Sequence, residues 1–204
     1  MSKGKAVNHR DAQVTILMAR NGTGKSTLVK TIADALGGKI VVVTMNGMPE
    51  IWRPYPAIDV SKKEDWASWE TGIRQVYYMQ HEKDTFRYIH RYFRNGILIL
   101  DDCRNYISSN LDNQEHLKHL LIDFRHKMMD LFFVVHSPGQ VPRQVWTFYS
   151  NVWVGATDAL LSKSIGIDSG ERIIAAQREV NERYRLALEK ADGSHYGIFK
   201  LIRP

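Results

Sequence analysis

The sequence predicts an α/β protein in which a mostly parallel central sheet is flanked by helices in three layers. Short apolar runs rich in β-branched residues alternate along the chain with segments whose apolar residues recur at the period of a helix. Strands that alternate with helices favour a parallel sheet, because each helix returns the chain to the edge where the next strand begins. The 204 residues are 44% hydrophobic and 25% charged, which is enough for one domain with a sizeable core.

The elements follow from these patterns in chain order. Six apolar runs are predicted strands: Val14–Met18, Ile40–Thr44, Ile97–Leu100, Leu131–Val135, Val152–Val154 and Gly197–Ile202. Five segments are predicted helices: the stretch from Gly24 to a stop at Gly37-Gly38, Lys62–Gln80, Asp84–Phe93, Asn113–His126 and Ser169–Glu189. Met45–Pro56, with Asn46-Gly47 and its prolines, is predicted to be a loop, and Asp192-Gly193 a turn.

The first predicted strand runs into a glycine-rich turn and then a helix. A strand, a glycine-rich turn, Gly-Lys-Ser and a helix, in this order, form the phosphate-binding loop, or Walker A motif, of nucleoside triphosphatases. The glycines allow successive N–H groups to point at phosphate oxygens, and the helix adds its N-terminal dipole. The predicted nucleotide-binding residues are Arg20, Asn21, Gly22, Thr23, Gly24, Lys25, Ser26 and Thr27. Lys25 can reach the β- and γ-phosphates and the Ser26 hydroxyl can bind Mg²⁺, although Ala19 replaces the first glycine of the motif.

Two carboxylates, Asp101 and Asp102, directly follow the predicted strand Ile97–Leu100. In open α/β sheets ligands bind at the carboxyl edge of the strands, so these side chains should face the phosphate loop as a Walker B element. We expect Asp101 to hold Mg²⁺, directly or through water. We expect Asp102 to polarise the attacking water as a general base.

A single histidine, His136, ends the predicted strand Leu131–Val135 and is followed by Ser137-Pro138. If this strand lies between the strand before the phosphate loop and the strand before Asp101, His136 points at the γ-phosphate. It would then sense the phosphate or orient the water. A structural role is the alternative for a lone histidine.

On these residues the chain resembles P-loop ATPases of the FtsK–HerA superfamily, and within it the small viral genome-packaging ATPases and, nearly as well, the Zot-like phage assembly proteins. The resemblance covers roughly residues 14–155. It is carried by Gly24-Lys25-Ser26-Thr27, by Asp101-Asp102 and by the stretch from Phe124-Arg125-His126 to Pro142. The family commonly ends the last strand of this stretch in Thr-Gln, where the present sequence has Val135-His136. His136 therefore matches the family's polar sensor by position and not by identity.

The resemblance implies a three-layer P-loop NTPase fold, with a tail at 1–12 and a single ATPase domain at 13–204 that ends in a helix-plus-strand appendage at 160–204. It also implies an ATP-hydrolysing, Mg²⁺-dependent motor that forms a homo-oligomeric ring and translocates DNA. The first expectation for such a motor is that it packages a viral genome into a capsid. In such rings an arginine of one subunit contacts the γ-phosphate held by the next. Arg125 is the first candidate, ahead of Arg104 and Arg143.

The formal net charge of +6 favours a polyanionic partner. The resemblance implies that this partner is DNA bound without sequence specificity, with double-stranded DNA as the first expectation and single-stranded DNA as the alternative. It adds capsid or portal-vertex proteins as possible contacts. Three arginines recur at helical spacing and could neutralise phosphates: Arg87, Arg91 and Arg94. We prefer the alternative of an amphipathic helix with Phe86, Ile89 and Phe93 inside and a charged outer face. Trp52-Arg53-Pro54-Tyr55 could contact DNA, contact a neighbouring subunit or pack its loop down.

The remaining features of the sequence bear on the cellular compartment and on the alternative functions. The single cysteine, Cys103, excludes an internal disulfide and fits a reducing compartment. No apolar run approaches the roughly 20 residues that span a bilayer, so we expect a cytoplasmic protein, in the host cell if viral. A Zot-like export protein usually carries a membrane segment after its ATPase domain, whereas this sequence ends at Ile202-Arg203-Pro204. A small kinase and a non-hydrolysing nucleotide switch are further alternatives, but two strand-end aspartates suit hydrolysis by water better.

Overall fold

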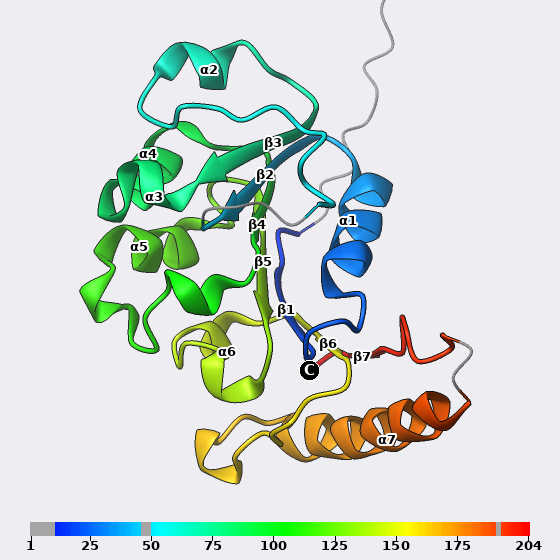
Figure 1. Ribbon diagram of the computed structural model, residues 1–204. Coiled ribbons are helices and arrows are strands. Elements are labelled where there is room, and N and C mark those ends of the chain that lie inside the picture. The colour runs from blue at the N-terminus through cyan, green and yellow to red at the C-terminus, as the bar shows by residue number, and fades with distance from the viewer. Residues whose placement is uncertain (1–10, 46–49, 191–192) are drawn as a thin grey trace, which may run out of the picture.

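The computed structural model describes residues 11–45, 50–190 and 193–204. Within these residues seven strands form one sheet in the order β3-β2-β4-β5-β1-β6-β7. The strands are β1 Val14–Met18, β2 Lys39–Thr44, β3 Gly72–Tyr77, β4 Gly96–Leu100, β5 Met129–Val135, β6 Asn151–Val154 and β7 Lys200–Ile202. Neighbouring strands pair in parallel except β6 and β7, which pair antiparallel. The predicted α/β fold with a mostly parallel sheet is confirmed (Figure 1).

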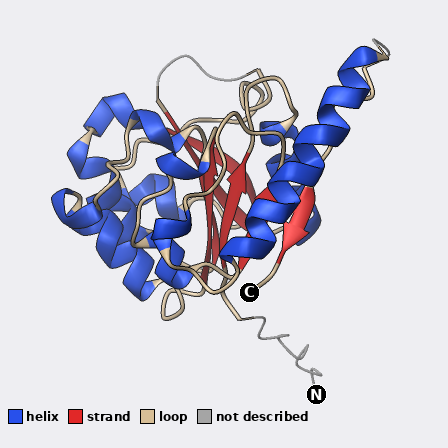
Figure 2. Ribbon diagram, turned by 90° about the horizontal axis from the view of Figure 1, so that it is seen from below, coloured by secondary structure: helices blue, strands red, loops and turns tan. Residues whose placement is uncertain are grey.

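Helices cover both faces of this sheet. They are α1 Lys25–Leu36, α2 Lys63–Ala67, α3 Tyr78–His81, α4 Lys83–Tyr92, α5 Glu115–Asp123, α6 Val145–Phe148 and α7 Gly170–Glu189. In Figure 1, α1 lies on one side of the strands, and α3, α4 and α5 lie on the other. Figure 2 shows α7 beside the strands at one end of the sheet and extending past them. Within the described ranges, no helix combines the length and the apolar character needed to cross a bilayer.

Two apolar cores follow from this layering. On one face, Val29 and Ala33 of α1 pack with Leu17, Val42 and other strand residues. On the opposite face, side chains of α4 and α5 pack against the alternate strand residues. Because helices cover both faces, every residue of β1 and β5 is buried, which explains why these strands read as continuous apolar runs.

The helix predicted over Lys62–Gln80 is wrong. This segment forms α2, then the strand β3, then α3. Gly72 has φ +89, a left-handed conformation that cannot continue a helix, and it begins β3. The strand is favoured because it pairs with all of β2 and because Ile73 and Val76 become buried. α6 was not predicted from the sequence, and β7 begins at Lys200, later than the predicted Gly197.

Several predictions fall partly outside the described residues. The predicted tail 1–12 lies outside them except for its last two positions, and so does the first residue of the turn Asp192-Gly193. Residues 46–49 of the predicted loop Met45–Pro56 also lie outside them. The described remainder of that loop, residues 50–56, contains neither helix nor strand, as predicted.

Candidate nucleotide-binding site

The predicted site residues follow three neighbouring strands. β5 lies between β1 and β4, and all three strands are parallel. Parallel strands bring their carboxyl ends to the same edge of a sheet. The phosphate loop after β1, Asp101-Asp102 after β4 and His136 after β5 therefore meet there. This is the strand order on which the prediction for His136 depended.

The phosphate loop has the backbone shape that its glycines permit. Gly22 and Gly24 have φ values of +74 and +91, and Gly24 leads directly into the first turn of α1. Within the loop, the Thr23 hydroxyl donates to the Arg20 carbonyl at 2.8 Å. The N–H of Arg20 donates to the Ala156 carbonyl at 2.7 Å, which ties the loop to the chain after β6. The N-terminus of α1 thus opens at the sheet edge, where it can bind an anion.

Lys25 is the first residue of α1, and its side chain bends back over the loop. Its ammonium donates to the Arg20 carbonyl at 3.0 Å and lies 3.2 Å from Nδ1 of His136. Burial lowers the pKa of Lys25, and the nearby carboxylates of Asp101 and Asp102 oppose that shift. The positive charge of Lys25 is thus held at the site by hydrogen-bond acceptors and two acidic neighbours.

His136 links Lys25 to Asp102. An ammonium can only donate hydrogen bonds, so Nδ1 of His136 accepts from Lys25. The ring proton then resides on Nε2, which donates to Oδ1 of Asp102 at 2.7 Å. The second oxygen of Asp102 accepts from Asn105 at 2.8 Å. Asp102 itself has a left-handed backbone with φ +47, which aspartate tolerates better than most residues. Three of the four predicted catalytic side chains, Lys25, His136 and Asp102, therefore form one continuous chain of contacts.

Asp101 is buried and is held by two side-chain donors. The Ser26 hydroxyl donates to it at 3.2 Å, and Nε1 of Trp52 donates to its Oδ2 at 2.6 Å. Burial raises the pKa of Asp101, and the hydrogen bonds from Trp52 and Ser26 act against that rise. The Tyr106 hydroxyl donates to the Asp101 carbonyl at 3.0 Å, which fixes the backbone where β4 ends.

The pair of Ser26 and Asp101 fits a magnesium ion. A hydroxyl and a carboxylate, both oxygen ligands, lie side by side at the mouth of the phosphate loop. Among the described residues, no group of three or more His, Cys, Asp or Glu is arranged to hold a metal by itself. Mg²⁺ commonly takes one or two protein oxygens and completes its coordination with substrate phosphates and water. These residues suit that mode of binding.

Arg125 does not join the site within one chain. It precedes β5, whereas Lys25 follows the parallel strand β1, so the two residues lie toward opposite edges of the sheet. The Arg125 guanidinium lies over the ring of Phe124, 5.4 Å from its centroid. Arg104 and Arg143 follow β4 and β5 and so lie toward the edge that carries the site. A role for Arg125 in hydrolysis therefore requires a second subunit.

The aromatic residues in both segments that could contact DNA are largely buried. Phe86 and Ile89 of α4, and Phe93 directly after it, are buried. This is the amphipathic helix that we preferred to a DNA-binding stripe. Arg87 lies on the outside, where it pairs with Asp84 at 3.2 Å. In the proline-rich loop Trp52 is fully buried, so that this side chain packs the loop down. Its hydrogen bond to Asp101 was missed, because nothing in the sequence indicates which of 204 residues a tryptophan will contact.

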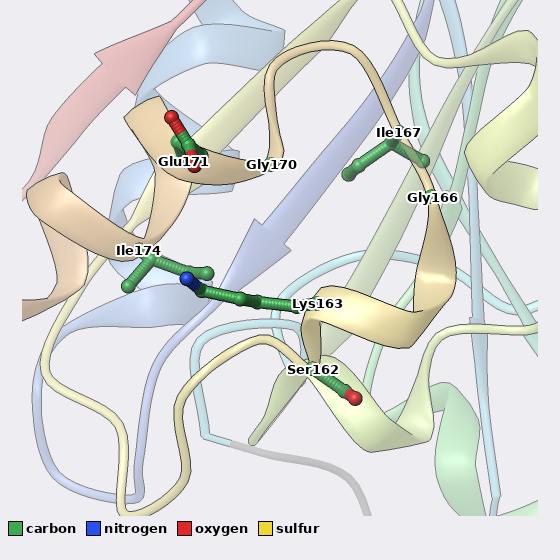
Figure 3. A pocket seen from close by; sticks show the side chains of 7 residues that line it. All are labelled: Ser162, Lys163, Gly166, Ile167, Gly170, Glu171 and Ile174. Carbon is green, nitrogen blue, oxygen red and sulfur yellow. The ribbon is translucent and has the colours of Figure 1, made fainter.

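A separate pocket precedes α7 (Figure 3). It is lined by Ser162, Lys163, Gly166, Ile167, Gly170, Glu171 and Ile174. In Figure 3 the Lys163 side chain extends toward Ile174 of α7, and Glu171 lies in the first turn of that helix. The pocket shares no residue with the phosphate loop or with the strand-end carboxylates.

Comparisons with known proteins agree with this geometry. No protein-family model matches the sequence, and no curated protein matches it significantly. The structure is similar to the genome packaging NTPase B204 from Sulfolobus turreted icosahedral virus 2 in complex with AMPPCP, with a TM-score of 0.60 and 13% identity over 94% of this chain and 92% of that chain. It is also similar to B204, the DNA-packaging ATPase from Sulfolobus turreted icosahedral virus, with a TM-score of 0.58 and 12% identity over 96% and 99% of the two chains.

A third similar structure is the N-terminal domain of zonular occludens toxin from Neisseria meningitidis, with a TM-score of 0.46 and 16% identity over 73% of this chain and 79% of that chain. At 12% and 13% identity, the likeness to B204 establishes the fold. The predicted three-layer P-loop NTPase fold is confirmed.

Proposed function

We propose that this protein is an ATP-hydrolysing motor that translocates DNA and packages a viral genome into a capsid. The observation that carries the proposal is the convergence of Lys25, His136 and Asp102 with the Ser26–Asp101 pair at one edge of the sheet. The function of B204, a genome packaging NTPase with the same fold, supports the same conclusion.

The hydrolytic roles follow from the contacts. The N–H groups of the loop and the Lys25 ammonium would bind the β- and γ-phosphates, while Ser26 and Asp101 would hold Mg²⁺. The metal would neutralise charge on the phosphates. When Lys25 turns toward the phosphates, Nδ1 of His136 loses its donor, while Asp102 still holds Nε2. His136 is then free to sense the γ-phosphate or orient the water, and Asp102 polarises that water as the general base.

The partners belong to the same proposal. A homo-oligomeric ring would bring Arg125 of one subunit, or Arg104 or Arg143, to the γ-phosphate bound by the next. The net charge of +6 supports attraction to double-stranded DNA through its phosphates, without sequence readout. Capsid or portal-vertex proteins would receive the motor, and the reaction would take place in the cytoplasm of the host cell.

The test is the ATPase rate with and without double-stranded DNA across a salt series. A motor that grips the phosphate backbone should be stimulated strongly by DNA at low salt. The stimulation should fade as salt rises, because each phosphate contact releases counterions. Hydrolysis that DNA does not change at any salt concentration would exclude a DNA motor, and near-zero turnover even with DNA would identify a nucleotide switch.

Two variants control this measurement. Lys25→Ala removes the phosphate-binding ammonium and should abolish nucleotide binding or turnover, so normal activity in this variant would refute the loop assignment. Asp102→Asn keeps the size of the side chain but removes its charge. It should still bind ATP and fail to hydrolyse it, and unchanged hydrolysis would place the general base elsewhere.

A further inference from the structure

Trp52 is the unexpected neighbour of the candidate magnesium site. It belongs to the irregular segment 50–56 that leads from β2 toward β3. Its side chain is 0% exposed, and its indole N–H donates to Oδ2 of Asp101, which is itself 3% exposed. At 2.6 Å this is a short contact between two buried side chains 49 positions apart in the sequence.

The hydrogen bond restricts how the Asp101 carboxylate can turn. The terminal torsion of an aspartate is intrinsically broad, so the side chain alone does not fix the direction of its oxygens. An indole N–H only donates, and it cannot become a metal ligand. By fixing Oδ2, Trp52 sets the plane in which both oxygens face the Ser26 hydroxyl, at 3.2 and 3.4 Å. It also gives a buried carboxylate a second side-chain donor besides the Ser26 hydroxyl.

Trp52 is in turn held in place from two sides. Its carbonyl accepts from the N–H of Tyr55 at 3.0 Å, and the Tyr55 carbonyl accepts from the buried amide of Gln75 in β3. The Lys30 ammonium of α1, the helix that carries Ser26, lies 5.7 Å from the centre of the Tyr55 ring. The segment 50–56 is thus anchored to the edge strand and to the phosphate-loop helix.

We propose that Trp52 is a positioning residue of the magnesium site, whose indole N–H orients the Asp101 carboxylate for the metal. The inference rests on the proposed function, because it requires Mg²⁺ to bind at Ser26 and Asp101. Groups that orient a metal ligand commonly contribute about 10- to 100-fold in metal affinity or activity.

The test compares Trp52→Phe with Trp66→Phe. Both substitutions remove an indole donor from a buried tryptophan and keep an aromatic ring. Nε1 of Trp66 donates to the Val60 carbonyl at 2.9 Å, in the core on the other face of the sheet. The Mg²⁺ affinity is measured by calorimetric titration into protein saturated with AMPPCP, and AMPPCP binding is measured separately in EDTA.

We expect Trp52→Phe to weaken Mg²⁺ binding by about tenfold or more while AMPPCP binding in EDTA is unchanged. Trp66→Phe should bind Mg²⁺ like the wild type. Equal Mg²⁺ affinity in Trp52→Phe and the wild type overturns the inference and leaves the proposed function intact. Absence of Mg²⁺ binding by the AMPPCP-saturated wild type overturns the proposed function itself.

A measurement on the wild type keeps the inference testable if Trp52→Phe does not fold. The chain has 5 tryptophans, so its ¹⁵N spectrum contains five indole N–H signals. Addition of Mg²⁺ to the AMPPCP complex should shift one of them, because the acceptor of that hydrogen bond becomes a metal ligand. If no indole signal responds to Mg²⁺, Trp52 does not orient the site.

Discussion

At the scale of single residues, Ala19 is the departure from the phosphate-loop motif, and Gly155 is the residue that accommodates it. A Cβ atom on Gly155 would lie 2.5 Å from Cβ of Ala19 and 2.6 Å from the ring of Phe199. The N–H of Gly155 donates to the Met18 carbonyl at 2.8 Å. The two backbone segments therefore cannot move apart without losing this hydrogen bond. The absence of a Cβ atom at Gly155 thus leaves room for the Ala19 methyl group.

We predict that Gly155→Ala lowers the free energy of unfolding by about 1–3 kcal/mol, because the core there is already full. It should also weaken nucleotide binding, since Ala19 leads directly into the phosphate loop. Adding Ala19→Gly should recover part of both losses but not all, because the contact with Phe199 remains. Urea denaturation and AMPPCP titration measure the two effects.

The matched control is Gly139→Ala, because a Cβ atom at Gly139 meets nothing within 4 Å. This variant should have nearly the stability of the wild type. If Gly155→Ala is as stable as Gly139→Ala, the packing account of Ala19 is wrong.

Most residues of the candidate site could be predicted from the sequence, but Trp52 could not. Lys25, Ser26, Asp101 and His136 were predicted to meet because each follows a recognisable strand or motif, and the strand order brings them together. Trp52 was not predicted to join them, since its contact with Asp101 depends on how an irregular segment folds over the sheet edge. Motifs specify residues, whereas partners of this kind come only from tertiary packing.

At the scale of elements, the central strands were predicted well, whereas β3, one of the two edge strands, was not predicted. β1, β2, β4 and β5 are covered on both faces, so their sequences are continuous apolar runs. β3 lies at the end of the sheet and mixes Gly72, Arg74 and Gln75 with its apolar residues. Its conformation is fixed by pairing with β2 and by the hydrogen bonds that Gln75 makes with Pro56 and Ile58, just before the turn that precedes α2. A local pattern records neither.

That turn supplies a prediction with a defined pH dependence. The Asp59 carboxylate accepts from the hydroxyl and the N–H of Ser61, at 2.7 and 3.0 Å, and lies 2.9 Å from Nε2 of His81. Hydrogen bonds from Ser61, together with His81, lower the pKa of Asp59 from 3.8 to about 2. A carboxylate with a depressed folded pKa contributes stability above its unfolded pKa of 3.8, and that contribution is lost as pH falls through about 2.

We therefore expect Asp59→Asn to be less stable than the wild type near neutral pH. The Asp59 side chain is 33% exposed, so solvent screening limits the difference to about 0.5–1 kcal/mol. Urea denaturation at a series of pH values should show the difference shrinking as pH falls below 3.8. A difference that is independent of pH would mean that the charge of Asp59 contributes nothing to the fold.

At the scale of the whole molecule, the sheet separates two groups that hydrolysis in a ring would need together. Lys25 lies toward the carboxyl edge of the parallel strands and Arg125 toward the opposite edge. A single chain cannot bring them to the same phosphate without unfolding β5. The phosphate-loop motif predicted Lys25 and the family resemblance implied Arg125, but only the strand directions show that their cooperation would require an assembly.

Mixing inactive subunits tests this cooperation. A transferring phosphoryl group gains about 10³–10⁵ in rate from an arginine, so Arg125→Ala alone should be nearly inactive if Arg125 acts across a boundary. Lys25→Ala alone should be inactive because its own loop cannot hold the triphosphate. In an equal mixture, roughly a quarter of the boundaries pair an intact loop with an intact Arg125, and ATPase activity should return. Lys25→Ala mixed with Asp102→Asn is the control, because both residues serve the nucleotide site of their own subunit. Every site in that mixture keeps one defect, so activity should not return. Full activity of Arg125→Ala alone, or no recovery in its mixture, would exclude Arg125 as the arginine that acts across the boundary. The same experiment would then be made with Arg104 and Arg143, which lie toward the carboxyl edge of the strands, where the site is.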